Sequence, residues 1–232
     1  MEIQGSVALV TGANRGIGKA FAQALLAHGA AKVYAGAREP ETVRDPGLVP
    51  LRLDVTDEEQ VAAVARAADD VGIVVNNAGI AGGPSLLEGS FDGARREMEV
   101  NYFGTWAVSR AFAPVLAAHG GGALVNMLSV ASWVANRRLP SYAASKSAQW
   151  SLTNAFRLAL REQGTLVVGV YAGYVDTDLA ADIDSPKILA TDVAEKTMAA
   201  LLNNESEVLV DDTTRQIRAA LSGDLETLYA NR

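Results

Sequence analysis

Three residues in the middle of the chain could together move a proton: Ser129, Tyr142 and Lys146. Tyr142 and Lys146 are four positions apart in a segment that we expect to be helical, so their side chains would share one face. An ammonium beside a phenol favours the ionised form and lowers a pKa that is ordinarily about 10. Ser129 follows the apolar run 123–128, so its hydroxyl would stand at the carboxyl end of a buried strand. The trio predicts a proton donor that works near neutral pH, although a Tyr–Lys pair at this spacing also arises by chance.

A glycine-rich turn near the start of the chain points to a nucleotide. Residues 6–11 read as a short buried strand and residues 16–28 as a helix, with Gly12, Gly16 and Gly18 between the strand and the first helical turn. Glycines allow a tight turn in which backbone N–H groups approach a pyrophosphate, and the helix N-terminus adds partial positive charge. The alternative is a turn without a ligand, but a strand before it and a helix after it favour dinucleotide binding.

Taken together, the motifs resemble the short-chain dehydrogenase/reductase family over nearly the whole chain, from Thr11 to about Thr177. Segments 53–55, 76–79 and 172–177 look like the family's adenine-binding strand end, its Asn-Asn-Ala-Gly signature and its nicotinamide segment, in which Ala172 replaces a proline. The resemblance implies a dinucleotide cofactor. The cofactor-binding positions that it implies are Gly12, Asn14, Arg15, Gly16, Ile17, Gly18, Ala37, Arg38, Asp54, Val55, Asn76, Ala78, Gly79, Tyr142, Lys146, Gly173, Val175 and Thr177.

The resemblance also implies four catalytic residues, which are Asn101, Ser129, Tyr142 and Lys146. Tyr142 would act as general acid toward a carbonyl oxygen that gains negative charge as hydride arrives at carbon. Lys146 would bind the ribose hydroxyls, and Ser129 would donate a hydrogen bond to the developing alkoxide. Asn101 would interrupt a long helix and hold a water that leads to the lysine. The alternative for Asn101 is a helical asparagine that faces solvent.

Several further positions have both a functional and a structural interpretation. Asp54 could accept a hydrogen bond from the adenine amino group, or it could end a strand in a turn. The resemblance implies that Asn77 stabilises the central sheet. Trp133 and Tyr174 are candidates for the substrate pocket, with Trp133 as an apolar wall.

The residues after the second strand predict a preference for NADP(H). An enzyme that prefers NAD usually has an acid here, which accepts the adenosine ribose hydroxyls and repels a 2′-phosphate. This chain has Ala37 at that position, followed by Arg38, and Arg15 in the glycine loop would approach the same phosphate. Guanidinium groups bind phosphate with charge-assisted hydrogen bonds. The alternative is that Arg38 is a solvated loop residue.

These residues would be positioned by an alternation of strands and helices, which predicts an α/β fold: a single-domain, Rossmann-like, doubly wound parallel sheet of about seven strands over residues 1–232. The expected strands are 6–11, 32–37, 49–54, 72–76, 122–129, 165–171 and 207–211. The expected helices are 16–28, 57–69, 91–119, 140–162 and 191–202, with another after Asp212.

The composition limits the kinds of partner and bound metal that we expect for this protein. A net charge of −7 argues against nucleic acid or an anionic membrane as a partner. The chain has no cysteine and two histidines, which excludes disulfides and makes a His/Cys zinc site a poor expectation. It shows no signal peptide and no apolar run long enough for a membrane span, so we expect a cytoplasmic protein.

The sequence therefore predicts an NADP(H)-dependent carbonyl reductase that also runs as an alcohol dehydrogenase on a small-molecule substrate. The alternatives are a dinucleotide-binding regulator without turnover, or other NADP-assisted chemistry such as epimerisation. We also expect a homodimer or homotetramer, because relatives pair the helices corresponding to 91–119 and 140–162 across a twofold axis. Those segments carry Phe103, Trp106, Phe112, Trp150 and Phe156. The alternative is that these aromatic side chains only pack on the sheet.

Overall fold

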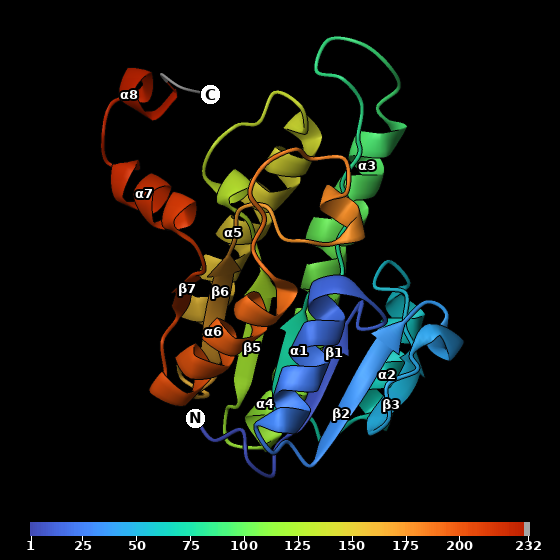
Figure 1. Ribbon diagram of the computed structural model, residues 1–232. Helices are drawn as coiled ribbons and strands as arrows, with labels where there is room; N and C mark the ends of the chain where they lie inside the picture. Colours follow the sequence, from blue (N-terminus) through green and yellow to red (C-terminus); the bar gives the residue numbers. More distant parts are fainter. Residues whose placement is uncertain (230–232) are drawn as a thin grey trace.

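The computed structural model describes residues 1–229 and contains a seven-stranded sheet with every pair of strands parallel. The strand order is β3-β2-β1-β4-β5-β6-β7, which confirms the expected fold class (Figure 1). The direction of winding reverses between β1 and β4, and in open parallel sheets ligands bind in the crevice at such a switch point. The strands are β1 Val7–Thr11, β2 Lys32–Ala37, β3 Leu48–Arg52, β4 Ile73–Asn76, β5 Ala123–Met127, β6 Leu166–Tyr171 and β7 Glu207–Leu209.

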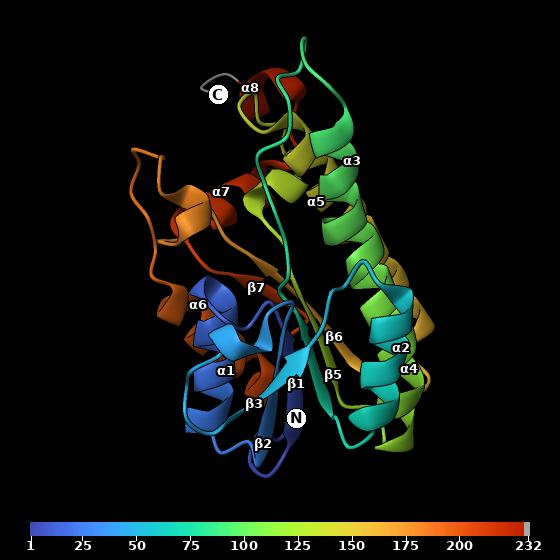
Figure 2. The same ribbon diagram turned by 90° about the vertical axis from the view of Figure 1, so that its right-hand side faces the viewer.

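Helices cover both faces of the sheet, because the strands are apolar on both sides. In β1, Ala8 and Val10 belong to one core cluster and Leu9 to the other, and all three are fully buried. Figure 2 shows the two helical layers on opposite sides of the sheet. One layer consists of α1 Gly16–Ala27 and α6 Ala190–Asn203, and the other of α2 Glu58–Ala67, α4 Thr105–Ala118 and α5 Pro140–Ala159.

The long helix expected over 91–119 is divided into three parts. Helix α3 covers Asp92–Met98, a π-helical segment covers Glu99–Gly104, and α4 follows. Short π-helical turns inside α-helices frequently mark functional sites. Three expected strands also end two residues early, since β3 stops at Arg52, β5 at Met127 and β7 at Leu209. In β5 the reason is Ser132, whose Oγ accepts the backbone N–H of Ser129 at 3.2 Å and turns the chain into a 3-10 helix.

Several segments lie above the carboxyl edge of the sheet, and two of them extend far from it. One is the loop 80–91 between β4 and α3, and the other consists of α7 Asp212–Ala220 and α8 Leu225–Tyr229 (Figure 1). Helix α8 is tied to the loop before α5, because the Tyr229 hydroxyl accepts the backbone N–H of Ala135 at 3.0 Å. The catalytic candidates lie at this carboxyl edge.

Candidate active site

Ser129, Tyr142 and Lys146 come together at the carboxyl end of β5 and the first turns of α5. The Nζ atom of Lys146 lies 5.8 Å from the centre of the Tyr142 ring, as the i,i+4 spacing on α5 requires. The Ser129 hydroxyl forms a hydrogen bond with the Tyr142 phenol. The Ser129 Oγ atom also accepts the backbone N–H of Ala131 at 3.1 Å, which holds the side chain in place. The structure therefore assembles a phenol, a hydroxyl and an amine in one buried corner.

Burial changes the ionisation of this corner in a way that the sequence did not predict. It raises the pKa of Tyr142 to about 12, and the nearby negative charge of Glu97 acts in the same direction, whereas the hydrogen bond from Ser129 lowers the pKa. Burial also lowers the pKa of Lys146 to about 7. The expected lowering of the tyrosine pKa is therefore wrong for this structure, in which burial and Glu97 raise that pKa and burial disfavours the charged form of the lysine.

Asn101 lies in the π-helical segment and is fully buried, so it does not face solvent. Its side chain accepts the backbone N–H of Ile80 at 2.8 Å and donates to the Ile80 carbonyl and to Ser145 Oγ, both at 2.9 Å. Gly79 leaves the space that this contact needs, because a Cβ there would lie 3.2 Å from Asn101 Oδ1 and 3.7 Å from Lys146 Nζ. Asn101 therefore fixes the chain after β4 against α5, next to the lysine.

The glycine loop has the features that a dinucleotide requires. Gly12 adopts a left-handed φ of 65°, and a Cβ on Gly18 would lie 2.1 Å from the Gly12 carbonyl oxygen, so only glycine permits the close approach of α1 to the loop. Arg15 at the N-cap of α1 makes no capping hydrogen bond through its side chain, and the first turn carries no acid that would repel a phosphate. Ile17 is partly buried and packs against the hydrophobic core. These features fit a pyrophosphate at the N-terminus of α1.

We expect Gly18→Ala to destabilise the protein and to abolish cofactor binding, because the added methyl collides with backbone rather than with a mobile side chain. Overpacking of this kind typically costs about 1–3 kcal/mol. Gly72→Ala is the matched control, since a Cβ there meets nothing within 4 Å. Thermal unfolding and calorimetric titration with NADPH would measure both effects. Equal cofactor affinity in the Gly18 and Gly72 variants would contradict the assignment of this loop.

The residues of the Asn-Asn-Ala-Gly signature do not all have the positions that were expected. Asn77 Nδ2 donates to the carbonyls of Thr11 at 3.0 Å and Gly12 at 3.3 Å, which ties the end of β4 to the glycine loop. Asn76 was expected to line the cofactor, but its side chain points inward, is 3% exposed, and donates to Ser109 Oγ at 3.0 Å and Asn126 Oδ1 at 2.9 Å. Ala78 and Gly79 stay at the carboxyl edge, where Ala78 N donates to the Thr11 hydroxyl.

Three arginines lie on the glycine loop and at the neighbouring ends of β2 and β3. Arg15 and Arg38 are exposed, as expected of phosphate ligands, and Arg15 forms an exposed ion pair with Asp178 at 2.6 Å. The third, Arg52, was missed by the sequence analysis. The parallel register sets Arg52 beside Ala37, and Arg52 Nη1 donates to the Arg38 carbonyl at 3.0 Å. Asn14 Nδ2 donates to Thr42 Oγ1 at 3.1 Å and joins the glycine loop to the turn after β2.

Asp54 and Val55 follow β3 in the order that was expected. The Asp54 carboxylate accepts the backbone N–H and the hydroxyl of Thr56 at 3.0 and 2.7 Å, so it does form the strand-end turn that was one of its two interpretations. Val55 is 7% exposed, and a Cβ on Gly104 would lie 2.6 Å from its Cγ2 atom. This contact sets the end of β3 against the π-helical segment.

The segment Gly173–Thr177 follows β6 and meets the glycine loop, because a Cβ on Gly16 would lie 3.3 Å from Thr177 Cγ2. Asp211, which the sequence analysis did not single out, holds it from the other side. Its Oδ2 atom accepts the Gly173 N–H at 2.7 Å, while Oδ1 caps α7 by accepting the Thr214 N–H at 2.8 Å. The aspartate before a helical pattern was the only signal for this role. Val175 is buried and forms a parallel bridge with Ile188.

The two substrate-pocket candidates have different surroundings. Tyr174 is 37% exposed at the carboxyl edge, where it is free to meet a substrate. Trp133 instead stacks on Tyr171, with ring centres 4.0 Å apart, and the Arg218 guanidinium of α7 lies 5.8 Å from the indole. The structure thus gives Trp133 a packing role between β6 and α7.

Residues 1–229 contain neither a cluster of candidate metal ligands nor a candidate membrane-spanning helix. No group of three or more His, Cys, Asp or Glu side chains among them is placed to hold a metal ion. Across the same residues, none of the helices combines the length and apolar character that crossing a membrane requires.

Comparison with known proteins places this site in a family. The profile of the family described as short chain dehydrogenase matches residues 6–188. A short chain dehydrogenase from Burkholderia cenocepacia, solved in complex with NADP, has a TM-score of 0.94 at 40% sequence identity, over 99% of this chain and 98% of that one. Another family member, from Burkholderia phymatum and in complex with NAD, has a TM-score of 0.82 at 29% identity, over 95% of each chain.

Relatives with an assigned reaction are also similar. The 7alpha-hydroxysteroid dehydrogenase of Escherichia coli is 31% identical over 200 residues, which cover 81% of this chain and 78% of the relative. The family profile spans the glycine loop, the Ser–Tyr–Lys corner and the segment Gly173–Thr177. The chain therefore belongs to the short-chain dehydrogenase family and is an NAD(P)-dependent oxidoreductase.

Proposed function

We propose that the protein is an NADP(H)-dependent carbonyl reductase, which reduces a ketone or aldehyde to an alcohol and also runs in the oxidative direction. The observation that carries the proposal is the intact corner of Ser129, Tyr142 and Lys146, with the lysine Nζ 5.8 Å from the tyrosine ring centre and the serine hydrogen-bonded to the phenol. A protein that only senses a dinucleotide has no need of this arrangement.

Each residue of the corner has a task in the reduction. When bound, the nicotinamide cofactor supplies the hydride. The Tyr142 hydroxyl donates a proton to the oxygen on which negative charge develops, and the Ser129 hydroxyl stabilises that charge with a hydrogen bond. Burial raises the pKa of the Tyr142 phenol to about 12, so the phenol keeps its proton across the physiological range and carries the proton that the reduction consumes. Lys146 would hold the ribose hydroxyls and place positive charge beside the phenol.

The choice of NADP(H) rests on the absence of an acid and the presence of cations at the end of β2. Ala37 is buried and uncharged, whereas Arg38 follows it, Arg52 lies beside it in the strand register, and Arg15 lies in the glycine loop. The NADP complex of the Burkholderia cenocepacia relative supports the same choice, although the Burkholderia phymatum relative was solved with NAD. Asp178 competes with a phosphate for Arg15 only weakly, because an exposed ion pair contributes little.

A panel of activated ketones tests the proposal directly. The protein is mixed with NADPH and each ketone, and the loss of reduced-nicotinamide absorbance is followed. We expect turnover with at least one ketone and the reverse reaction with the corresponding alcohol. NADPH binding without turnover across the panel would favour a dinucleotide-binding regulator instead, and inversion at a carbinol carbon without net oxidation would favour an epimerase.

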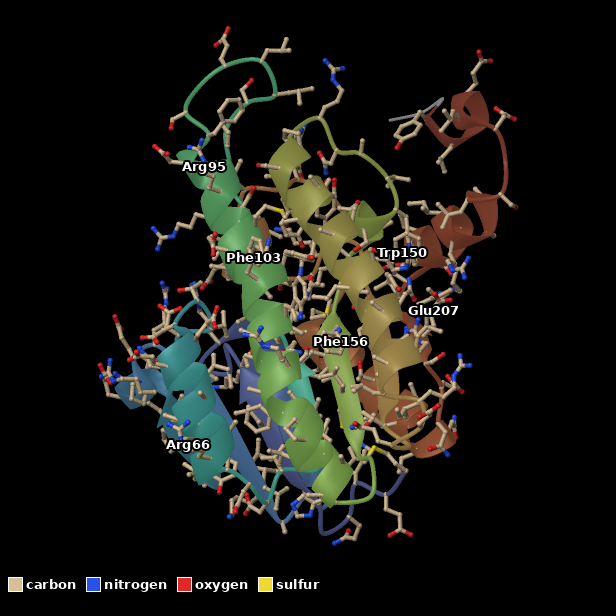
Figure 3. The ribbon with its side chains drawn as sticks, turned by 180° about the vertical axis from the view of Figure 1, so that it is seen from behind. Arg66, Arg95, Phe103, Trp150, Phe156 and Glu207 are labelled. Atoms are coloured by element: carbon tan, nitrogen blue, oxygen red, sulfur yellow. The ribbon has the colours of Figure 1, made fainter. Side chains whose placement is uncertain are left out.

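We further propose that the protein is a homodimer or homotetramer, assembled through α4 and α5. Phe112 is fully buried against the sheet, but Phe103, Trp106 and Trp150 are 46%, 40% and 37% exposed on the outer surface. Figure 3 shows Phe103 on the π-helical segment that leads into α4, and Trp150 and Phe156 on the neighbouring α5. Packing on the sheet thus accounts for only part of the aromatic side chains.

Light scattering at micromolar concentration should give the mass of two or four chains. Trp106→Glu should shift the mass toward one chain, because it places a charge in the apolar contact. Leu202→Glu is the control, since Leu202 is 49% exposed on α6, in the opposite helical layer. A wild-type protein with the mass of one chain would refute the assembly.

A further inference from the structure

The ammonium of Lys146 is held by neutral groups alone. Lys146 is 4% exposed, and its Nζ atom donates to the Met127 carbonyl at 2.8 Å and to Gln149 Oε1 at 2.7 Å. None of the ion pairs among the described residues includes it. A buried ammonium without a carboxylate depends on the acceptors that remain, so the Gln149 amide oxygen is one of two groups that favour the charged form.

Gln149 continues into a chain of hydrogen bonds that is closed to solvent. Gln149 and Thr105 are 0% and 3% exposed. Gln149 Nε2 donates to Thr105 Oγ1 at 2.8 Å, and that hydroxyl donates to the Asn101 carbonyl at 2.9 Å. An ammonium has only donors, so the amide oxygen must face it. The amide nitrogen must then face the threonine, and the threonine hydrogen must face the carbonyl.

The chain connects two parts of the site that belong to different elements. Lys146 and Gln149 lie three residues apart on α5, while Thr105 begins α4 and Asn101 lies in the π-helical segment before it. The Asn101 side chain is already committed to Ile80 and Ser145. Its backbone carbonyl is therefore the fixed end on which the Gln149 amide, and through it the lysine, is oriented.

We propose that Gln149 is a positioning residue for the reaction: its amide holds the Lys146 ammonium beside Tyr142 and fixes it, through Thr105, to the Asn101 carbonyl. This inference rests on the proposed function. Gln149 acts through the lysine and touches neither the phenol nor the serine. Its contribution is to keep the amine charged and in one rotamer in a place where burial opposes the charge.

The charged groups that act on Tyr142 and Lys146 come from the elements packed around them. Tyr142 lies on the same helix as Lys146, and within the described chain the acid of the neighbouring elements that acts on the tyrosine is Glu97 of α3. The 3-10 helix Val130–Ser132 carries no titratable side chain, and Glu99 of the π-helical segment is exposed. Loss of the Gln149 acceptor should therefore be felt mainly as a lower pKa of Lys146, which burial already lowers to about 7.

The test is the dissociation constant of NADP⁺ measured by calorimetry between acid and alkaline pH. The charged lysine would bind the ribose hydroxyls, so affinity should fall as pH rises through the lysine pKa of the free protein. In Gln149→Leu this fall should occur about one to two pH units lower, because a hydrogen bond to a charged group changes the protonation equilibrium about tenfold to a hundredfold. In Gln149→Glu the new carboxylate should move the fall to higher pH.

Gln163→Leu is the matched control. Gln163 also makes two amide hydrogen bonds, to the Ala113 carbonyl at 3.1 Å and Thr165 Oγ1 at 2.7 Å, but these lie at the opposite end of the sheet from Lys146. The Gln163→Leu substitution should leave the pH dependence of NADP⁺ binding unchanged. Thermal unfolding of each variant separates positioning from general loss of structure, and the Glu variant retains size and polarity if the Leu variant does not fold.

The outcomes decide between the two proposals. Opposite shifts in the Leu and Glu variants, with the control unchanged, would support the positioning role even if no ketone is reduced, in which case only the proposed reaction fails. Wild-type pH dependence in a folded Gln149→Leu or Gln149→Glu protein would overturn the positioning role even if the wild-type enzyme reduces ketones. Shifts of the same size in the Gln163 variant would overturn it as well.

Discussion

Replacement of Tyr142 by phenylalanine is expected to lower kcat for carbonyl reduction by about 10²–10⁴-fold, the usual contribution of general acid catalysis. Phenylalanine keeps the ring that lies 5.8 Å from Lys146 Nζ, so the shape of the corner is preserved. The substitution removes only the hydroxyl that meets Ser129. NADPH affinity should therefore remain within a few-fold of the wild-type value.

Steady-state kinetics with NADPH and an accepted ketone, together with a calorimetric binding curve, measure both quantities. Tyr34→Phe is the control, because its hydroxyl accepts from Lys32 on β2 and has no part in the site. Lys146→Ala should differ from Tyr142→Phe by weakening cofactor binding as well as kcat. If Tyr142→Phe retained more than about a tenth of the wild-type kcat, a group other than the tyrosine would have to be the acid.

The sheet and its helices were predictable because local signals and burial agree. Strands apolar on both faces alternate with amphipathic helices, and this pattern admits few parallel arrangements. The element ends were less predictable, since they depend on polar contacts such as the Ser129–Ser132 capping pair that ends β5. The division of the helix 91–119 depends on Asn101, whose partners lie after β4 and on α5.

The candidate catalytic residues could be identified from the sequence because they lie in short motifs, whereas the residues that hold them in place could not. Gln149 and Thr105 are polar residues inside helices, and nothing in their immediate neighbours indicates that they face each other and the lysine. Arg52 becomes visible only through the register between β2 and β3. Such contacts join residues far apart in the sequence, and only the assembled fold brings them together.

The pKa values of the site were also not predictable from the sequence. From the sequence, a lysine beside a tyrosine indicates a lower phenol pKa, because attraction between opposite charges is the effect that spacing reveals. The structure adds desolvation, which raises the pKa of Tyr142 to about 12 and lowers that of Lys146 to about 7. Burial depends on every element around the corner, so it could not be judged from the motif.

The wild-type enzyme is expected to prefer NADPH over NADH by about 10²-fold or more in kcat/KM, since each charge-assisted hydrogen bond to a phosphate contributes about 1.5–3 kcal/mol. Arg15 and Arg38 are exposed and available for this purpose, and Arg52 orients the Arg38 backbone. Equal kcat/KM with the two cofactors in the wild-type enzyme would contradict the assignment.

The double substitution Ala37→Asp with Arg38→Ala is expected to reverse the preference. The new carboxylate would accept the ribose hydroxyls and repel a 2′-phosphate, and one of the phosphate ligands would be lost. Arg52 lies beside position 37 in the register, so it would pair with the carboxylate and weaken the repulsion. Adding Arg52→Ala should therefore make the reversal larger than the double substitution does.

Arg66→Ala controls for the loss of one positive charge, because Arg66 lies on the outer surface of α2, away from the end of β2 (Figure 3). It should leave the ratio of kcat/KM values for NADPH and NADH unchanged. Calorimetric titration of each variant with both cofactors would show whether the change arises in binding, as direct recognition of the phosphate requires. A triple variant that still prefers NADPH would mean that Arg15 alone, freed from Asp178, carries the recognition.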